Sequence, residues 1–289
     1  MKWLIATLVA LTTVSGLCVA ASPPANTTGI EVRPRPSPNP SASAPDEDTA
    51  AEIALLESVN QSRKQAGIPP VRLEESLRQA ARLHARRMVD MRQLEHQFPG
   101  EPTLLQRIAD VSSVPLDRAG ENIADVSCPG AAHDLFMHSP PHRQNILHPR
   151  FNVAGIVAIW SHGRLYVVED FGHAMPSYSA RETARRVGEA LNEARTSAGL
   201  SELAPFSPPH LDEAACALAK EGRPNARLVA ASYSNRKVIT YTQSTPDVLP
   251  PAASDVLENP NLCHFAVGSC YARNAAYPTG IYWVAILLY

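Results

Sequence analysis

Two separated segments of the chain repeat one pattern, and this repeat constrains the fold more than any other feature. V-N-Q-S-R-K-Q-A-G-I at 59–68 and L-N-E-A-R-T-S-A-G-L at 191–200 share N-x-x-R-x-x-A-G. L-R-Q-A-A at 77–81 and L-D-E-A-A at 211–215 follow in the same order, with two extra residues before the second. Amphipathic helices can resemble one another by chance, but two matched segments in one order favour duplication. We therefore predict two modules, the second a degenerate repeat of the first.

Periodicity predicts the fold class of the first module. A helix cap at Asp48–Thr49 precedes apolar residues at helical spacing, and Gly67 ends that helix. Later the period changes to two, so 152–160 and 164–171 are predicted strands joined by a tight turn at 161–163. The helical stripes are Ile53, Leu56, Val59 and Arg63, then Leu77, Ala80, Ala81, His84, Met88 and Met91. Helices followed by a hairpin predict an α+β fold, with helices packed on an antiparallel sheet.

The N-terminal region has the pattern of an exported protein. Residues 1–21 combine a positive start, an apolar stretch and small residues for cleavage, which is typical of a signal peptide. An uncleaved anchor is the alternative, although the apolar stretch is short for a membrane span. Residues 22–48 are rich in Pro and Ser, so we expect a disordered linker. The predicted domains are then 49–176 and 180–289, in a secreted or periplasmic protein without a further transmembrane segment.

Charge argues against one class of partner. The 289-residue chain has a formal net charge of −2. No basic field therefore attracts nucleic acid, and we expect no nucleic-acid partner.

Four segments of the first module carry a family resemblance when they are taken together. They are N-x-x-R-x-x-x-G-I at 60–68, L-x-x-A-A-x-L-H-A-x-x-M at 77–88, G-E-N-I-A at 120–124 and S-P-P-H-R-Q-N-I-L at 139–147. This set resembles the CAP superfamily (cysteine-rich secretory proteins, antigen 5, pathogenesis-related proteins) in its bacterial form. The resemblance covers about 50–175 well and 180–289 only at its two ends. It implies a CAP-like α-β-α sandwich with an antiparallel sheet between helices.

The resemblance also implies a binding cleft. In the family, two histidines and up to two acidic residues line a cleft, and the matching positions here are His96, Glu121 and His142. The fourth position, which is acidic in many eukaryotic members, falls at Ser139. Phe136 stands where a tryptophan is usual. A set of four is thus reduced to three, which puts metal affinity in question.

The chemistry of these three residues leaves two interpretations open. Two imidazoles and a carboxylate could hold Zn²⁺ or another divalent cation with one position open. Alternatively, Glu121 could hydrogen-bond a loop, and His142 could bond the backbone beside Pro140–Pro141. The combined motifs favour a real cleft over three separate structural roles.

Three functions follow as hypotheses. The first, which we favour, is a binding module for a small or lipid-like ligand or a peptide, with cell-wall or host contact implied by the family. The second is a metal-dependent, peptidase-like hydrolase with Glu121 as base, or a weaker variant with Ser139 as nucleophile. The third is a non-catalytic surface or structural protein.

The second module lacks the motifs that would build the cleft. Between Lys220 and Cys263 the sequence has neither G-E-N nor S-P-x-H-R. Four cysteines remain after signal cleavage, and they allow three pairings. We favour Cys263–Cys270, which flank a short predicted turn, and leave Cys128 and Cys216 either free or joining the modules.

Overall fold

The computed structural model describes residues 46–234 and 236–289. The predicted signal peptide, 1–21, and most of the predicted linker lie outside these residues. Asp46 and Glu47, at the end of the predicted linker, pair with a strand of the first module. No helix in the described ranges is long and apolar enough to cross a bilayer.

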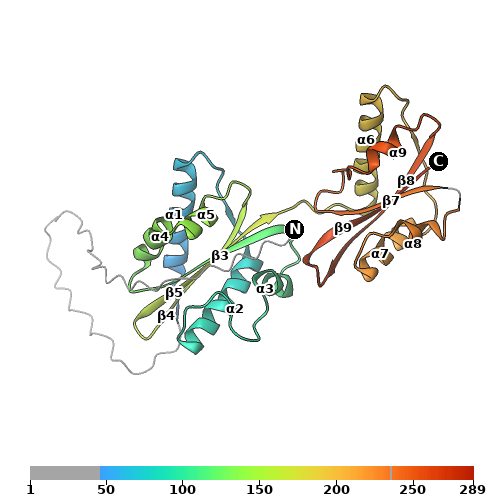
Figure 1. The fold of residues 1–289 in the computed structure, drawn as a ribbon. Coiled ribbons are helices and arrows are strands. Elements are labelled where there is room, and N and C mark those ends of the chain that lie inside the picture. Colours follow the sequence, from blue (N-terminus) through green and yellow to red (C-terminus); the bar gives the residue numbers. More distant parts are fainter. Residues whose placement is uncertain (1–45, 235) are drawn as a thin grey trace, which may run out of the picture.

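The first module is a sheet between two helical layers (Figure 1). The strand order is β1-β4-β5-β3, and β2 pairs in parallel with the edge of β4. One apolar core joins α1, α4 and α5 to one face, while α2 and α3 pack on the other. Its elements are β1 (Asp46–Glu47), α1 (Thr49–Gln65), β2 (Arg72–Leu73), α2 (Glu75–Met91), α3 (Leu104–Val111), β3 (Leu116–Val126), α4 (Pro129–His138), α5 (Pro140–Ile146), β4 (Val153–Ser161) and β5 (Arg164–Ala174). The predicted α+β class and the α-β-α sandwich are confirmed.

The second module has the same three layers (Figure 1). The strand order is β6-β8-β9-β7, with α6 and α9 on one face and α7 and α8 on the other. Its elements are α6 (Ala180–Ser197), β6 (Ala204–Pro205), α7 (Leu211–Glu221), α8 (Ala226–Ala230), β7 (Lys237–Gln243), α9 (Ala253–Leu257), β8 (His264–Asn274) and β9 (Tyr277–Leu288).

A buried arginine fixes the end of the first helix in each module. Arg63 and Arg195 are 0% and 1% exposed, and each guanidinium donates only to backbone carbonyls in the bonds observed. The acceptors are Pro69, Ile146, His148 and Phe151 for Arg63, and Ser201, Leu257, Asn259 and Leu262 for Arg195. The segments that share N-x-x-R-x-x-A-G therefore make matching contacts. In each module one side chain satisfies several loop carbonyls that would otherwise be buried without a partner.

In each module, one glycine allows the start of a helix to lie directly against the sheet. A Cβ on Gly155 of β4 would lie 2.2 Å from the backbone of Leu77 and Arg78. A Cβ on Gly268 of β8 would lie 2.3 Å from the carbonyl oxygen of Leu211. Any larger residue would push α2 or α7 off its strand, so glycine is required at both crossings.

Several local predictions hold and others need correction. The Asp48 side chain caps α1 by accepting from the Ala51 N–H at 2.9 Å, as predicted. The hairpin of β4 and β5 turns at His162–Gly163, also as predicted. Ile53, however, is 56% exposed, because in the first two turns of α1 the buried stripe runs through Glu52 and Leu55, one residue earlier than predicted. Met91 is 45% exposed at the end of α2, where the chain leaves the sheet.

The favoured cysteine pairing is wrong. A disulfide joins Cys216 of α7 to Cys270 of β8, within the second module. Cys263 is exposed and free. Cys263 immediately precedes β8 and is seven residues from Cys270, which is about 20 Å in an extended strand, far beyond the reach of a disulfide. The predicted turn between them does not exist.

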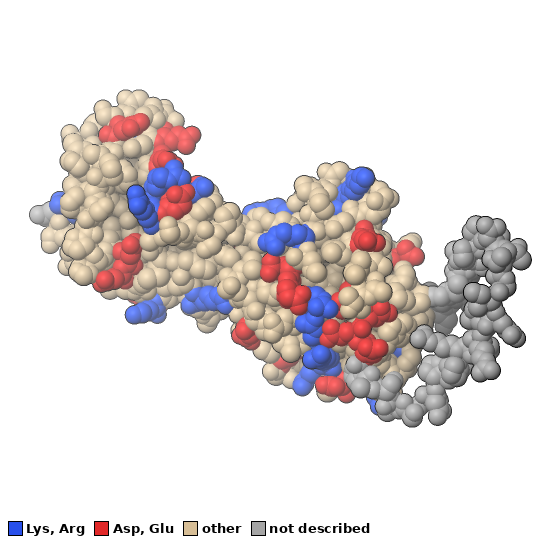
Figure 2. Space-filling view, turned by 180° about the vertical axis from the view of Figure 1, so that it is seen from behind, with Lys and Arg blue, Asp and Glu red and all other residues tan. Residues whose placement is uncertain are grey.

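Charged side chains of both signs are interspersed over the surface, with wide uncharged areas between them (Figure 2). A group of ion pairs joins β1 and α1 to α2. Glu47 accepts from Arg82 at 2.8 Å and from Arg86 at 3.1 Å. Arg78 pairs with the buried Glu52 at 2.7 Å. These pairs fix the point at which the N-terminal segment enters the fold.

Candidate functional site

Three separate segments bring the predicted site residues together. Glu121 lies on β3, His142 on α5, and His96 on the connection between α2 and α3. His96 Nδ1 is 2.9 Å from Glu121 Oε1. The rings of His96 and His142 are 6.3 Å apart between centroids. The convergence expected from the motifs is therefore present in the geometry.

An arginine that the sequence analysis missed occupies the centre of this group. Arg107, on α3, is 5% exposed and forms a close ion pair with Glu121 Oε2. Its other terminal nitrogen donates to the His96 carbonyl at 3.1 Å. Both carboxylate oxygens of Glu121 are thus engaged, one by His96 and one by Arg107.

A sequence signal for this arginine does exist. T-L-L-Q at 103–106 has the spacing of a capping box, and Thr103 and Gln106 form that box at the start of α3. A helix beginning there places Arg107 one position beyond the box. Because α3 has only eight residues, its apolar positions form no long periodic pattern that would mark it as a helix.

His84 fixes the loop that carries His96. It is fully buried, as its place on the apolar stripe of α2 predicts. Its Nδ1 lies 2.8 Å from Glu101 Oε1, and its Nε2 lies 2.9 Å from the Glu95 carbonyl. Burial raises the pKa of Glu101, but hydrogen bonds from the Phe98 N–H and from His84 outweigh it and lower that pKa overall.

Two further carboxyls lie behind the site. Across the β3–β5 ladder Glu121 faces Asp170, and Asn122 faces Glu169. Both acidic residues of β5 are fully buried, on opposite faces of a sheet that helices cover on both sides, so an exposed strand face is ruled out. Burial, together with the Glu121 charge, raises the pKa of Asp170, whereas Arg107 lowers it. Burial raises the pKa of Glu169 to about 8, against a hydrogen bond from Asn122 at 3.1 Å.

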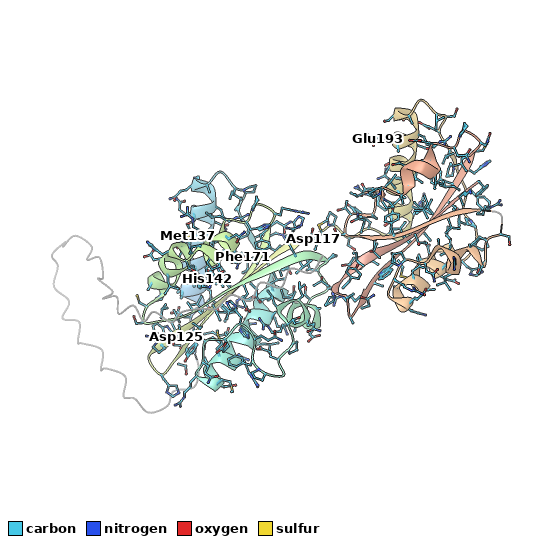
Figure 3. All side chains as sticks on the ribbon, viewed as in Figure 1. Asp117, Asp125, Met137, His142, Phe171 and Glu193 are labelled. Carbon is cyan, nitrogen blue, oxygen red and sulfur yellow. A yellow bond between two sulfur atoms is a disulfide. The ribbon has the colours of Figure 1, made fainter. Side chains whose placement is uncertain are left out.

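The surroundings of His142 disfavour its charged form. Burial, and then the neighbouring His96, lower the pKa of His142. Its ring packs on Phe136 at 5.3 Å between centroids, and its Nδ1 is buried without a hydrogen-bond partner among the described residues. Figure 3 labels His142 in the first module.

Neighbouring polar residues have separable roles. Asn145 donates to the Glu121 carbonyl at 3.1 Å and to Asn122 at 2.9 Å, so it braces the site. Ser139 joins α4 to α5, and among the described residues its hydroxyl makes no hydrogen bond to an imidazole or to Glu121. His173 instead binds Asp117 at 2.7 Å, toward the second module (Figure 3).

The donor set does not fit a resident metal. Within 46–234 and 236–289, no three His, Cys, Asp or Glu side chains are placed to hold a metal ion. The cation that neutralises Glu121 is Arg107. The surface also carries an open groove of about 610 Å³ that contains none of the three convergent residues. That groove is lined by Met137, His138, Pro140, Arg143, Gln144, Leu147, His148 and Pro149.

Comparisons with known proteins identify the first module. Residues 56–171 match the model of the CAP family, described as the cysteine-rich secretory protein family. The uncharacterized protein YkwD of Bacillus subtilis is 32% identical over 115 residues, which are 39% of this chain and 44% of that protein. The chain thus spans less than half the length of this relative.

Solved structures also resemble the chain. An extracellular SCP-domain protein of Bacillus anthracis is 24% identical, with a TM-score of 0.40 over 44% of this chain and 41% of its own. An outer surface protein of Borrelia burgdorferi is 16% identical, with a TM-score of 0.43 over 45% of this chain and 99% of its own. The family match covers 56–171, so the likeness to the CAP family lies in the first module.

Proposed function

We propose that this chain is an exported CAP-domain protein whose first module binds a ligand at His96, Glu121 and His142 without catalysing a reaction. The observation that carries the proposal is the convergence of three residues from distant segments, with His96 Nδ1 2.9 Å from Glu121. The His96 side chain is 48% exposed, so one face of this group is open to solvent. Export is supported by the N-terminal sequence pattern.

The hydrogen bonds indicate what the ligand offers. Glu121, paired with Arg107, accepts from the Nδ1–H of His96, so the Nε2 edge of that half-exposed ring faces a ligand. When the ring is neutral, Nε2 accepts from a hydroxyl or an amide N–H. We therefore infer a small or lipid-like molecule with a hydroxyl group, or a peptide.

The same contacts disfavour a hydrolase. A general base needs a free acceptor within reach of the attacking water. Both Glu121 oxygens are engaged by Arg107 and His96. Without a hydrogen bond from Ser139 to an imidazole among the described residues, that hydroxyl has no base to activate it.

We also infer that the second module is a reduced copy of the first. The support is the matching set of contacts made by Arg63 and Arg195, and by Gly155 and Gly268. Asn60 and Asn192 add a third pair, since each accepts from the N–H of a residue eleven positions later, at 2.8 Å. The G-E-N and S-P-x-H-R segments have no counterpart in the second copy.

Native mass spectrometry of the exported protein tests ligand binding. The wild type is compared with His96→Ala and with His162→Ala, whose ring lies in the β4–β5 turn. We expect a bound mass in the wild type and in His162→Ala and its loss in His96→Ala. No bound mass in the wild type, or the same mass in all three, contradicts the proposal. N-terminal sequencing of the same samples should begin near Ala21 or Ser22; a start at Met1 contradicts processing.

A further inference from the structure

The second module contacts the first at the end of α3 and at the start of β3. Arg273 of β8 donates to the Ala109 carbonyl at 2.7 Å and to the Ser112 carbonyl at 2.5 Å. Thr279 of β9 donates its hydroxyl proton to the Leu116 carbonyl at 2.8 Å, in a buried position. Figure 1 shows the tip of the β8–β9 hairpin reaching this part of the first module.

The helix that the hairpin contacts is α3, which carries Arg107. Its first turn is closed within the first module by the Thr103–Gln106 capping box. Its last carbonyls are satisfied from the second module by the Arg273 guanidinium. A cation at a helix C-terminus binds the free carbonyls and complements the helix dipole.

Small movements of α3 would reach the site directly. Arg107 lies one residue before Ile108, which is fully buried against α2 and the sheet. The Arg107 guanidinium simultaneously contacts Glu121 and the His96 carbonyl. A rotation or fraying of α3 must therefore change the contacts of both Glu121 and His96.

We propose that Arg273 is a positioning residue, through which the second module holds α3 and so keeps Arg107 against Glu121 and His96. The second module then acts on the binding site without supplying a residue to it. This assignment rests on the proposed function only in giving the site its role, because the positioning itself exists without ligand.

Consequences for the site follow from the charges around Glu121. With Arg107 withdrawn, Glu121 and Asp170 face each other across β3 and β5 without a cation between them. Glu121 would then have lost the partner of its Oε2 and be free to turn, which changes the contact of its Oε1 with His96. The His96 imidazole signal therefore reports whether Arg273 keeps Arg107 in place.

The test uses the full chain without ligand. The variants are Arg273→Ala, Arg273→Lys and, as matched control, Arg223→Ala, whose exposed guanidinium pairs with Glu221 of its own module. Hydrogen exchange is followed for 104–112 and for α1, and NMR records the His96 imidazole signal. In Arg273→Ala we expect exchange in 104–112 to rise about tenfold, the scale of one lost charge-assisted hydrogen bond. We also expect a shifted His96 signal and unchanged α1 exchange.

Arg273→Lys should fall between the wild type and Arg273→Ala, since an ammonium keeps the charge but not the planar fork. If Arg273→Ala loses the signal of the buried Trp283, Thr279→Val replaces it, with a smaller change in the same direction expected. Exchange in 104–112 and a His96 signal that match Arg223→Ala overturn the proposal. Because no ligand is present, this result is independent of whether the mass-spectrometric test finds one.

Discussion

At the scale of single residues, one buried guanidinium lies among several buried carboxyl groups at the site. Arg107 is the cation nearest Glu121, and its charge also lowers the pKa of Asp170 behind it. Removing one partner of a buried pair costs about 3–5 kcal/mol, because the other charge stays uncompensated. The stability of the first module should therefore depend on Arg107 more than on any surface arginine.

The first prediction concerns this arginine. Arg107→Met should lower the free energy of unfolding of the first module by about 3 kcal/mol or more. The matched control is Arg118→Met, whose 37% exposed side chain pairs with Asp117 at 3.4 Å and should cost less than about 1 kcal/mol. Urea unfolding followed by hydrogen exchange of 49–176 measures both. Equal losses in the two variants would show that Glu121 is held without Arg107.

A second prediction concerns pH. The pKa of Glu169 is raised by burial from 4.5 to about 8 in the folded protein. Its contribution to stability is therefore fully present below about pH 4.5 and is lost as pH rises to about 8. Glu169→Gln removes this dependence. The free energy of unfolding of the variant, relative to that of the wild type, should therefore rise between pH 5 and pH 8. Each unit of pKa difference corresponds to about 1.4 kcal/mol. Urea unfolding of both proteins at pH 5 and pH 8 tests this prediction. A difference in unfolding free energy between variant and wild type that is the same at both pH values refutes it.

At the scale of elements, the sequence predicted several helices and strands that have a clear apolar pattern, among them α2, β4 and β5. The apolar stripe of α2 follows from helical periodicity, because α2 buries one face. Strands β4 and β5 are apolar runs, and both of their faces are buried. β3 was missed as a strand. Its sequence, L-D-R-A-G-E-N-I-A-D-V, places polar residues on both faces and so lacks a period of two. Those polar residues are the ones that build the site.

Contacts between distant segments were out of reach for a different reason. The motifs identified His96, Glu121 and His142 because each lies in a short conserved-looking pattern of the family. Arg107 and Asp170 are defined by what they face across the fold, and no local spacing encodes that. The Cys216–Cys270 bond is similar, since it requires α7 to cross β8.

The disulfide gives the element-scale prediction. Cys216→Ala together with Cys270→Ala should lower the stability of the second module by about 2–4 kcal/mol, because the unfolded chain regains the freedom of a long loop. Cys263→Ser is the control, since that thiol is exposed and free, and it should leave stability unchanged. Thermal unfolding with and without reductant measures both. A stable double variant would mean that the packing of α7 on β8 suffices alone.

At the scale of the whole molecule, the two modules share three layers but differ in their polar residues. The first contains the polar segments that bring His96, Glu121 and His142 together, while the second contains the apolar residues that hold its own layers together. The hairpin tip of the second module contacts α3 of the first. Under the proposed duplication, one copy of the fold would act on the other.

The last prediction asks whether both modules depend on the buried arginine near the end of their first helix. Arg63 and Arg195 each donate to four backbone carbonyls, and truncation leaves those carbonyls without their donor. Because a buried acceptor left unpaired costs about 1–3 kcal/mol, Arg63→Ala and Arg195→Ala should each cost several kcal/mol. Each loss should be confined to its own module in hydrogen exchange. Lys64→Ala and Arg185→Ala serve as controls, because they replace exposed residues of the same two helices. Each should cost about 0.5 kcal/mol or less. If Arg195→Ala costs no more than Arg185→Ala, the second module does not use the anchor, and the inference of duplication loses its structural support.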